Sequence, residues 1–309
     1  MTVKMLSCFK AASRDSYTLR KIKSNNWCRA GAKEECYGKK NHLYVRIPHR
    51  GAAMRNAPSY GVRGRRNFTN TGVRVTASTF GKARIGTYAE KANGHITVES
   101  AAERLVAHLL CIDPRVRSFK PQPFTVDLVE RRLLYSRTEI TEARKMRQAL
   151  RGHIEYTPDF ATVQIDGLQC AYEVKTEGYE GDTIYQDKID CAREIIEAHG
   201  ISLCTAVVPE DERHPLLVNI QLLKPALTRA HEYLTTDLID QVERYCASGP
   251  VLQRNLCADI QISPGMIPPL LVIGVLQADL VRHRIQGSLE LSPAFGDLSH
   301  LCLIEELLS

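Results

Sequence analysis

The sequence predicts an α/β fold followed by a smaller helical domain. Between residues 83 and 208, short apolar runs typical of strands alternate with stretches whose apolar residues recur at helical spacing. This alternation is typical of a sheet covered by helices. After about residue 228 the pattern changes to short helical runs, so a second domain of different architecture is expected.

The α/β part begins with an extended segment at residues 83–98, which the turn residues Asn93-Gly94 interrupt. A helix is expected over Ser100–Asp113, because its apolar residues share one face and Asp113-Pro114 ends it. Further extended segments are expected at Val116–Val129, His153–Ile165, Gln169–Thr176 and Leu203–Val208, and an amphipathic helix at Asp187–His199. The charged stretch Thr138–Arg151 is either a helix or a mobile excursion.

The last part of the chain has the element order of a winged helix-turn-helix. Helical runs are expected at 236–246, 252–260 and 266–276, and Gln286-Gly287 separates residues 280–285 from 288–291 in a hairpin-like pattern. Any small helical module could show the same order. The run at 266–276 has no Arg, Lys, Asn or Gln for base recognition, so its apolar face suits packing or a protein partner better.

Charge is distributed unevenly along the chain. Residues 1–91 hold 20 Lys and Arg against 4 Asp and Glu, a net charge of +16, so the rest carries −10 of the total +6. A basic arm suggests a nucleic-acid partner, and a solvated leader that binds nothing specific fits the composition equally well. The expected divisions are a basic, largely irregular extension at 1–75, an α/β domain at 76–228 and a winged-helix-like domain at 229–309.

The expected location is the cytoplasm, in association with a bacterial-type nucleoid. No apolar run reaches the 18 residues of a membrane span, and Met1–Lys10 lacks the apolar region of a secretory signal. In a reducing compartment the ten cysteines are expected to be free thiols. Cys28, Cys36 and His42 could hold zinc, although their spacing matches no standard ligand pattern.

Two strand segments carry the candidate chemistry. Pro158-Asp159 lies in one strand-like run, and Glu173-Val174-Lys175 lies in the next. Glu173 and Lys175 are two residues apart, so they project from one face of a strand while Val174 can be buried on the other. Asp159 and Glu173 could hold Mg²⁺ or Mn²⁺, and Lys175 would orient a water and help to deprotonate it. A surface hairpin with a charged outer face is the structural alternative.

A third acid, Glu103, flanks the apolar stripe of the preceding helix. It shares a face with Val106 and Leu110, which favours a metal-ligating role over that of Glu99 one turn earlier. A structural alternative is a capping box, with Ser100 as the N-cap residue and Glu103 three positions later.

The expected hairpin raises a geometric difficulty. Asp166-Gly167 is a natural two-residue turn, and strict pairing from it places Asp159 opposite Val174, away from Glu173. A one-residue bulge near Pro158, or a wider loop, would bring Asp159 beside Glu173.

The order and spacing of these residues resemble the TnsA family, the endonuclease subunit of heteromeric cut-and-paste transposases. The resemblance covers roughly residues 80–295, residues 1–75 have no clear counterpart, and some members have Gln at the position of Glu173. The residues that carry it are Gly81–Gly86, Val98–Arg104, Asp113–Val116, Gln122-Pro123, Thr157–Phe160, Glu173–Lys175, His214–Ile220 and Leu222-Leu223.

The resemblance implies a PD-(D/E)xK, restriction-endonuclease-like core and a winged-helix domain. It implies a magnesium-dependent DNA endonuclease that cuts the 5′ strand at transposon ends, beside a TnsB-like transposase that cuts the 3′ strand. A TnsC-like AAA+ ATPase would contact the C-terminal domain. The expected catalytic residues are Glu103, Asp159, Glu173 and Lys175, and the basic residues expected to contact DNA are Lys188, Arg193, Arg63, Arg65 and Arg66.

Two other functions stay open. One is a self-sufficient restriction or repair nuclease of the same fold, which would cut plain duplex DNA without partners. The other is a non-catalytic winged-helix DNA-binding protein whose α/β part is a scaffold and binds neither magnesium nor manganese.

Overall fold

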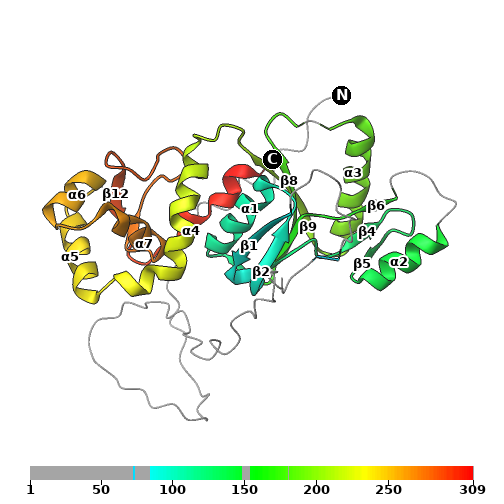
Figure 1. The fold of residues 1–309 in the computed structure, drawn as a ribbon, viewed down its shortest axis with the longest axis horizontal. Helices are drawn as coiled ribbons and strands as arrows, with labels where there is room; N and C mark the ends of the chain where they lie inside the picture. The colour runs from blue at the N-terminus through cyan, green and yellow to red at the C-terminus, as the bar shows by residue number, and fades with distance from the viewer. Residues whose placement is uncertain (1–71, 74–83, 148–153, 180, 309) are drawn as a thin grey trace, which may run out of the picture. The chain divides into compact units, whose positions relative to one another are not determined.

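The computed structural model describes residues 72–73, 84–147, 154–179 and 181–308, which form the mixed α/β fold expected from the sequence (Figure 1). Within them, a four-stranded sheet has the order β3-β7-β8-β9. Its strands are β3 (Val116–Pro121), β7 (Phe160–Gln164), β8 (Gln169–Thr176) and β9 (Ser202–Val208). The first three are antiparallel neighbours, and β9 runs parallel to β8.

Helices cover both faces of this sheet. α1 (Ala101–Ile112) packs on one face, and α3 (Thr183–Ala198) packs on the other. Alternate residues of β8 divide between the two cores, with Val174 on the α1 side and Ala171 on the α3 side. Val174 is therefore buried as expected. Glu173 and Lys175 lie two and four positions after Ala171, so they face the same side of the sheet as Ala171, toward α3.

A hairpin precedes α1. β1 (Ile85–Ala89) and β2 (Gly94–Val98) pair antiparallel on either side of the short helix η1 (Glu90–Ala92). Asn93 has a φ of 60° and Gly94 a φ of 137°, conformations that suit these two residue types. The predicted turn at Asn93-Gly94 is confirmed.

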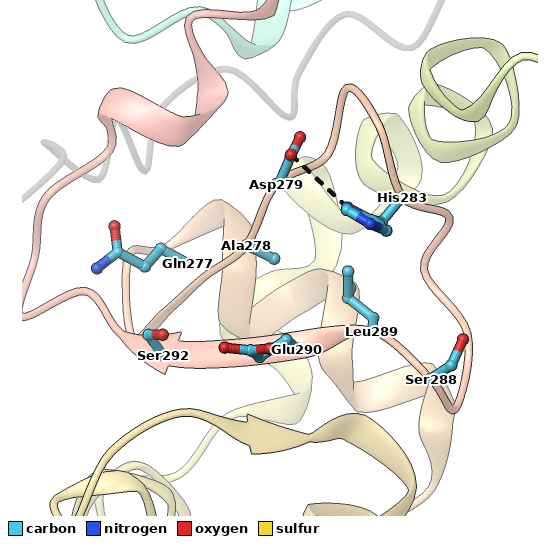
Figure 2. A pocket seen from close by; sticks show the side chains of 8 residues that line it. All are labelled: Gln277, Ala278, Asp279, His283, Ser288, Leu289, Glu290 and Ser292. Atoms are coloured by element: carbon cyan, nitrogen blue, oxygen red, sulfur yellow. Dashed lines mark ion pairs between the residues drawn. The ribbon is translucent and has the colours of Figure 1, made fainter.

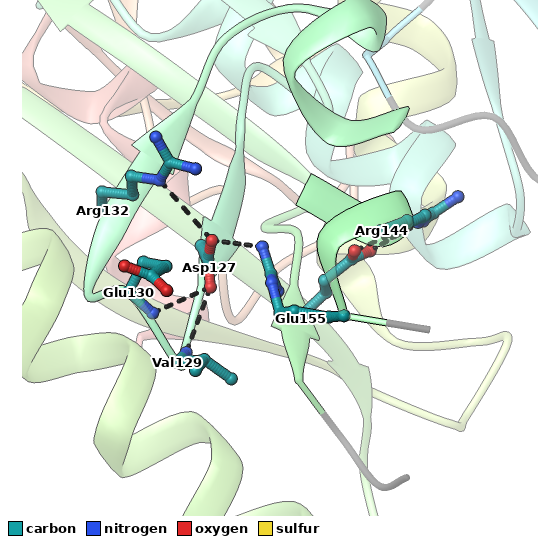
Figure 3. A network of polar contacts seen from close by, with 7 residues as sticks. Asp127, Val129, Glu130, Arg132, Arg144 and Glu155 are labelled. Carbon is teal, nitrogen blue, oxygen red and sulfur yellow. Dashed lines mark hydrogen bonds and ion pairs between the residues drawn. The ribbon is translucent and has the colours of Figure 1, made fainter. Parts of the chain in front are cut away.

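A second, three-stranded sheet has the order β5-β4-β6, from β4 (Thr125–Asp127), β5 (Arg132–Leu134) and β6 (Glu155–Tyr156). α2 (Arg137–Met146) follows β5 and confirms the helical alternative for this charged stretch. The fully buried carboxylate of Asp127 accepts hydrogen bonds from the backbone N–H groups of Val129 and Glu130, and it pairs with Arg132 and Arg147 (Figure 3). Ion pairing between Arg144 and Glu155 ties α2 to β6.

The helix α4 (Pro215–Tyr233) is absent from the elements expected from the sequence. Pro225 lies inside it, and a proline weakens any helix prediction because it removes a backbone donor. α4 packs against α1 and continues through residue 228. Both sides of the domain boundary predicted at that residue belong to one compact unit, so this boundary stays a prediction. Across the described ranges, every helix is too short or too polar to cross a membrane.

The C-terminal part contains α5 (Thr236–Cys246), α6 (Gln253–Asp259) and α7 (Ile267–Val272), close to the three helical runs expected. Three strands pair in the order β10-β12-β11. They are β10 (Val251–Leu252), β11 (Leu276–Gln277) and β12 (Glu290–Pro293). The short helices η2 (Pro264–Met266), η3 (Ser299–Leu301) and η4 (Leu303–Leu307) complete it. Every residue of α7 is buried, so its apolar face serves packing.

The predicted strand at residues 280–285 is wrong. β12 pairs with β11 instead, and residues 278–289 form the loop between them. The buried side chain of Asn219 in α4 binds this loop: its amide donates to the carbonyls of Leu280 and His283, and its oxygen accepts from the N–H of Ile285. Backbone groups of the loop therefore form hydrogen bonds with a side chain of α4 instead of with a neighbouring strand. The local sequence pattern does not reveal such a distant contact.

Candidate functional site

The β7–β8 hairpin closes through a three-residue loop, residues 165–167. Gln164 N–H donates to the carbonyl of Leu168 at 2.8 Å, and Gly167 N–H donates to the carbonyl of Gln164 at 3.1 Å. Gly167 has a φ of 93°, which glycine adopts without strain. The two-residue turn expected at Asp166-Gly167 is therefore wrong, and the wider-loop alternative is confirmed.

The hydrogen bonds of Asp159 place its side chain beside Glu173. The pairing of β7 with β8 ends where Phe160 lies opposite Tyr172, and Asp159 is the residue before Phe160. Oδ2 of Asp159 accepts from the N–H of Val174, the residue after Glu173 in β8. A two-residue turn would have shifted the pairing of the two strands by one residue. The two candidate metal ligands therefore lie next to each other at this end of the hairpin.

Asp159 lies where the chain passes from the small sheet to the large one. Its backbone N–H donates to the carbonyl of Tyr172 at 2.9 Å, and its Oδ2 accepts from the N–H of Val174 at 2.8 Å. Burial raises the pKa of the Asp159 carboxyl well above its usual range, and the charges of Glu173 and Glu103 raise it further. The three carboxylates are therefore electrostatic neighbours.

Glu173 is buried, with 7% of its surface exposed, and each of its carboxylate oxygens has a protein partner. Oε2 accepts from the hydroxyl of Tyr156 at 2.8 Å. Oε1 accepts from the hydroxyl of Tyr185 at 2.6 Å and pairs with Lys175 Nζ at 2.7 Å. Burial raises the pKa of both tyrosines, and the adjacent Glu173 carboxylate raises each further. Both tyrosines therefore act as neutral donors to Glu173.

Lys175 occupies an aromatic setting next to Glu173. Its Nζ lies 4.7 Å from the ring centroid of Tyr179 and 4.5 Å from that of Tyr185. The two rings meet edge to face, with centroids 5.8 Å apart. Cation–π contacts of this kind hold a lysine ammonium group in place.

Glu103 belongs to the N-terminus of α1. Its N–H donates to Ser100 Oγ at 3.0 Å, and its carboxylate accepts from Ser100 Oγ and from the N–H of Glu99, each at 2.9 Å. The capping alternative is therefore confirmed, with Glu99 in place of Ser100 as the backbone donor. Burial raises the pKa of Glu103, and the charges of Glu99 and Glu173 add to the effect. Glu99 itself accepts a hydrogen bond from Gln122 at 3.2 Å.

The donor chemistry of this site fits a hard divalent cation. Among the described residues, no three His, Cys, Asp or Glu side chains stand in a ready-made ligand arrangement, because Glu103 and Glu173 are turned to protein donors. The charge of Glu173 nevertheless contributes to the raised pKa of both Glu103 and Asp159, so a cation between these carboxylates would offset unfavourable charge.

Sequence reasoning missed Tyr156 and Tyr185. Tyr156 comes from β6 in the small sheet, and Tyr185 comes from the first turn of α3. Neither has a fixed spacing to Glu173, so no local signal identifies them. The adjacency of Tyr156 to Pro158-Asp159 is the single available hint.

The basic residues expected to contact DNA are only partly described. Lys188 Nζ lies 5.9 Å from the ring centroid of Tyr156, near the site. Arg193 donates to the carbonyl of Leu203 at 2.6 Å, a contact that ties α3 to β9. Arg63, Arg65 and Arg66, like the candidate zinc ligands Cys28, Cys36 and His42, lie outside the described residues.

A separate cavity of about 470 Å³ opens in the C-terminal part (Figure 2). Asp279 and His283 from the loop point toward each other there, with Oδ2 and Nδ1 3.6 Å apart, and Glu290 of β12 also lines it. Two acidic side chains would repel a phosphate, so this cavity is a poor candidate for nucleic-acid contact.

Comparisons with known proteins give no indication of function. No protein-family model matches the chain, and a search of curated proteins finds no match.

Proposed function

We propose that this chain is a magnesium-dependent DNA endonuclease with a PD-(D/E)xK core. The observation that supports it best is the position of the Asp159 carboxylate, whose Oδ2 accepts a hydrogen bond from the N–H of Val174, next to Glu173 in β8. Lys175 follows Glu173 on the same strand face, and Glu103 is close enough for its charge to raise the pKa of Asp159. Acids and a lysine in this arrangement suit metal-assisted phosphodiester hydrolysis.

In this proposal, Glu103, Asp159 and Glu173 would hold the metal. A bound divalent cation would supply Lewis-acid stabilisation of the scissile phosphate and a more acidic water. Lys175, held between Glu173 and the aromatic rings, would orient the attacking water. The hydrogen bond from Tyr156 fixes the position of Glu173.

We further propose a TnsA-like role, cutting the 5′ strand at transposon ends with a TnsB-like transposase and a TnsC-like AAA+ ATPase. The chain order α5, β10, α6, α7, β11, β12 supports a winged-helix C-terminal domain, since three helices and a three-stranded sheet follow one another as that architecture requires. The buried α7 favours a protein-binding role for this domain over base recognition.

Strand cleavage by active-site variants tests the proposal. Asp159→Ala and Glu173→Ala should each lower the cleavage rate at least about a hundredfold, because each removes a charged group from the centre that stabilises the transition state. The control is Asp187→Ala, an exposed carboxylate on α3. Circular dichroism should show all three variants folded. Wild-type cleavage by either active-site variant, with metal present, would end the nuclease assignment.

A further inference from the structure

Oε1 of Glu173 cannot ligate a metal in the arrangement seen here without giving up one of its two partners. Oε2 is held by Tyr156, and Oε1 is shared by Tyr185 and Lys175. Tyr156 is buried within β6, whereas Tyr185 is half-buried in the first turn of α3. Tyr185 is therefore the tyrosine of the two that can move away from the carboxylate at lower cost.

The ring of Tyr185 lies close to the backbone of Gly181, where there is no side chain. A Cβ at residue 181 would lie 2.6 Å from Cδ1 of Tyr185, closer than side-chain carbons approach one another. Gly181 also has a φ of 69°, a conformation that favours glycine. The absence of a side chain at this position lets the ring fold back over Glu173.

Space for the ring to move lies next to it. A cavity of about 430 Å³ is lined by Tyr179, Gly181, Asp182, Tyr185 and Lys188. The Tyr185 ring already forms part of its wall, so a change of side-chain rotamer can carry the hydroxyl from Glu173 into this open volume.

We propose that Tyr185 is a displaceable cover on Glu173. Its hydroxyl holds Oε1 in the metal-free protein and leaves when Oε1 ligates a divalent cation, so the cation and the tyrosine compete for this oxygen. The inference rests on the proposed metal site and adds a residue that sets its affinity.

Metal binding by the full chain tests the cover directly. Tyr185→Phe removes the competing hydroxyl and keeps the ring, so the Mn²⁺ dissociation constant from isothermal titration calorimetry should fall about tenfold, as expected for loss of one hydrogen bond to a charged group. Gly181→Ala should shift the constant in the same direction, because the added methyl group displaces the ring. Tyr179→Phe is the matched control, with a neighbouring ring and an unchanged constant expected.

The outcomes separate the two proposals. Unchanged or weaker Mn²⁺ binding by Tyr185→Phe, in a protein whose wild type binds Mn²⁺, overturns the cover and leaves the metal site standing. Weaker binding would instead assign Tyr185 the positioning of Glu173 for the metal. If neither the wild type nor Tyr185→Phe binds Mn²⁺, the metal site is absent and both proposals fall.

Discussion

At the scale of single residues, spacing within one strand is the strongest predictor of the candidate site. Glu173 and Lys175 share a face because they are two apart, and the structure joins them in an ion pair. The position of Asp159 next to Glu173 could be assigned only from its hydrogen bonds to the backbone of β8. Tyr156 and Tyr185 could not be predicted, since they reach Glu173 from a different sheet and from a helix.

A cysteine pair allows a prediction at the same scale. Cys170 Sγ donates to Cys204 Sγ at 3.3 Å, and this hydrogen bond, with a contribution from the charge of Arg193, lowers the pKa of Cys204 to about 7. The rate of alkylation of Cys204 by iodoacetamide, followed by mass spectrometry, should therefore rise with pH around a midpoint near 7. Cys257 and Cys302, whose pKa values are raised by burial, should react more slowly at neutral pH.

The variant Cys170→Ala removes the donor and should move the midpoint for Cys204 up toward the usual thiol value of about 8.5. An unchanged midpoint would show that Cys170 does not lower the pKa of Cys204.

At the scale of elements, the periodicity of apolar residues predicted the strands and helices whose own apolar residues form their buried face. The helix over residues 183–198 buries Ile189, Ala192, Ile195 and Ile196, the four residues expected to face inward. The prediction of a hairpin at residues 280–291 was wrong because a distant residue holds this segment as a loop. Its backbone groups bind Asn219, which lies more than sixty residues earlier, and such a contact leaves no trace in the local pattern.

Substitution of this asparagine tests how the C-terminal loop is held. Asn219→Ala should lower the free energy of unfolding by about 2–4 kcal/mol, because it removes the three hydrogen bonds that the buried Asn219 side chain makes to the loop backbone. Chemical denaturation measures the change. Gln221→Ala, at an exposed position of the same helix, is the control and should change stability by less than about 0.5 kcal/mol. Equal effects of the two substitutions would contradict the role of Asn219.

At the scale of the whole molecule, the charge distribution and the buried α7 bear on how the protein would find its substrate. The net charge of +16 is confined to residues 1–91, and a basic arm attracts DNA without regard to sequence. All six residues of α7 are buried, so this helix cannot read bases from its present position. Specific recognition would then have to come from partner proteins.

The predicted consequence is dependence on partners. The isolated chain should bind DNA weakly and without sequence preference, with an affinity that falls steeply as salt increases. Site-specific cleavage of a transposon-end duplex in magnesium should appear only when a TnsB-like transposase and a TnsC-like ATPase are added. Gel analysis of end-labelled strands measures both. Efficient, site-specific cleavage by the chain alone would favour a restriction or repair nuclease over the TnsA-like role.

The central claim is that Asp159, Glu173 and Glu103 form a metal site, and thermal unfolding with and without Mn²⁺ tests it most directly. Because the pKa of Asp159 is raised in the folded protein, its ionised form destabilises the fold at neutral pH, where the unfolded chain loses that proton more easily. Asp159→Asn should therefore raise the melting temperature of the metal-free protein. Mn²⁺ should raise the melting temperature of the wild type and leave that of Asp159→Asn almost unchanged, since a ligand that binds only the folded state stabilises it. An equal Mn²⁺ effect on both proteins, or no effect on the wild type, would contradict the claim.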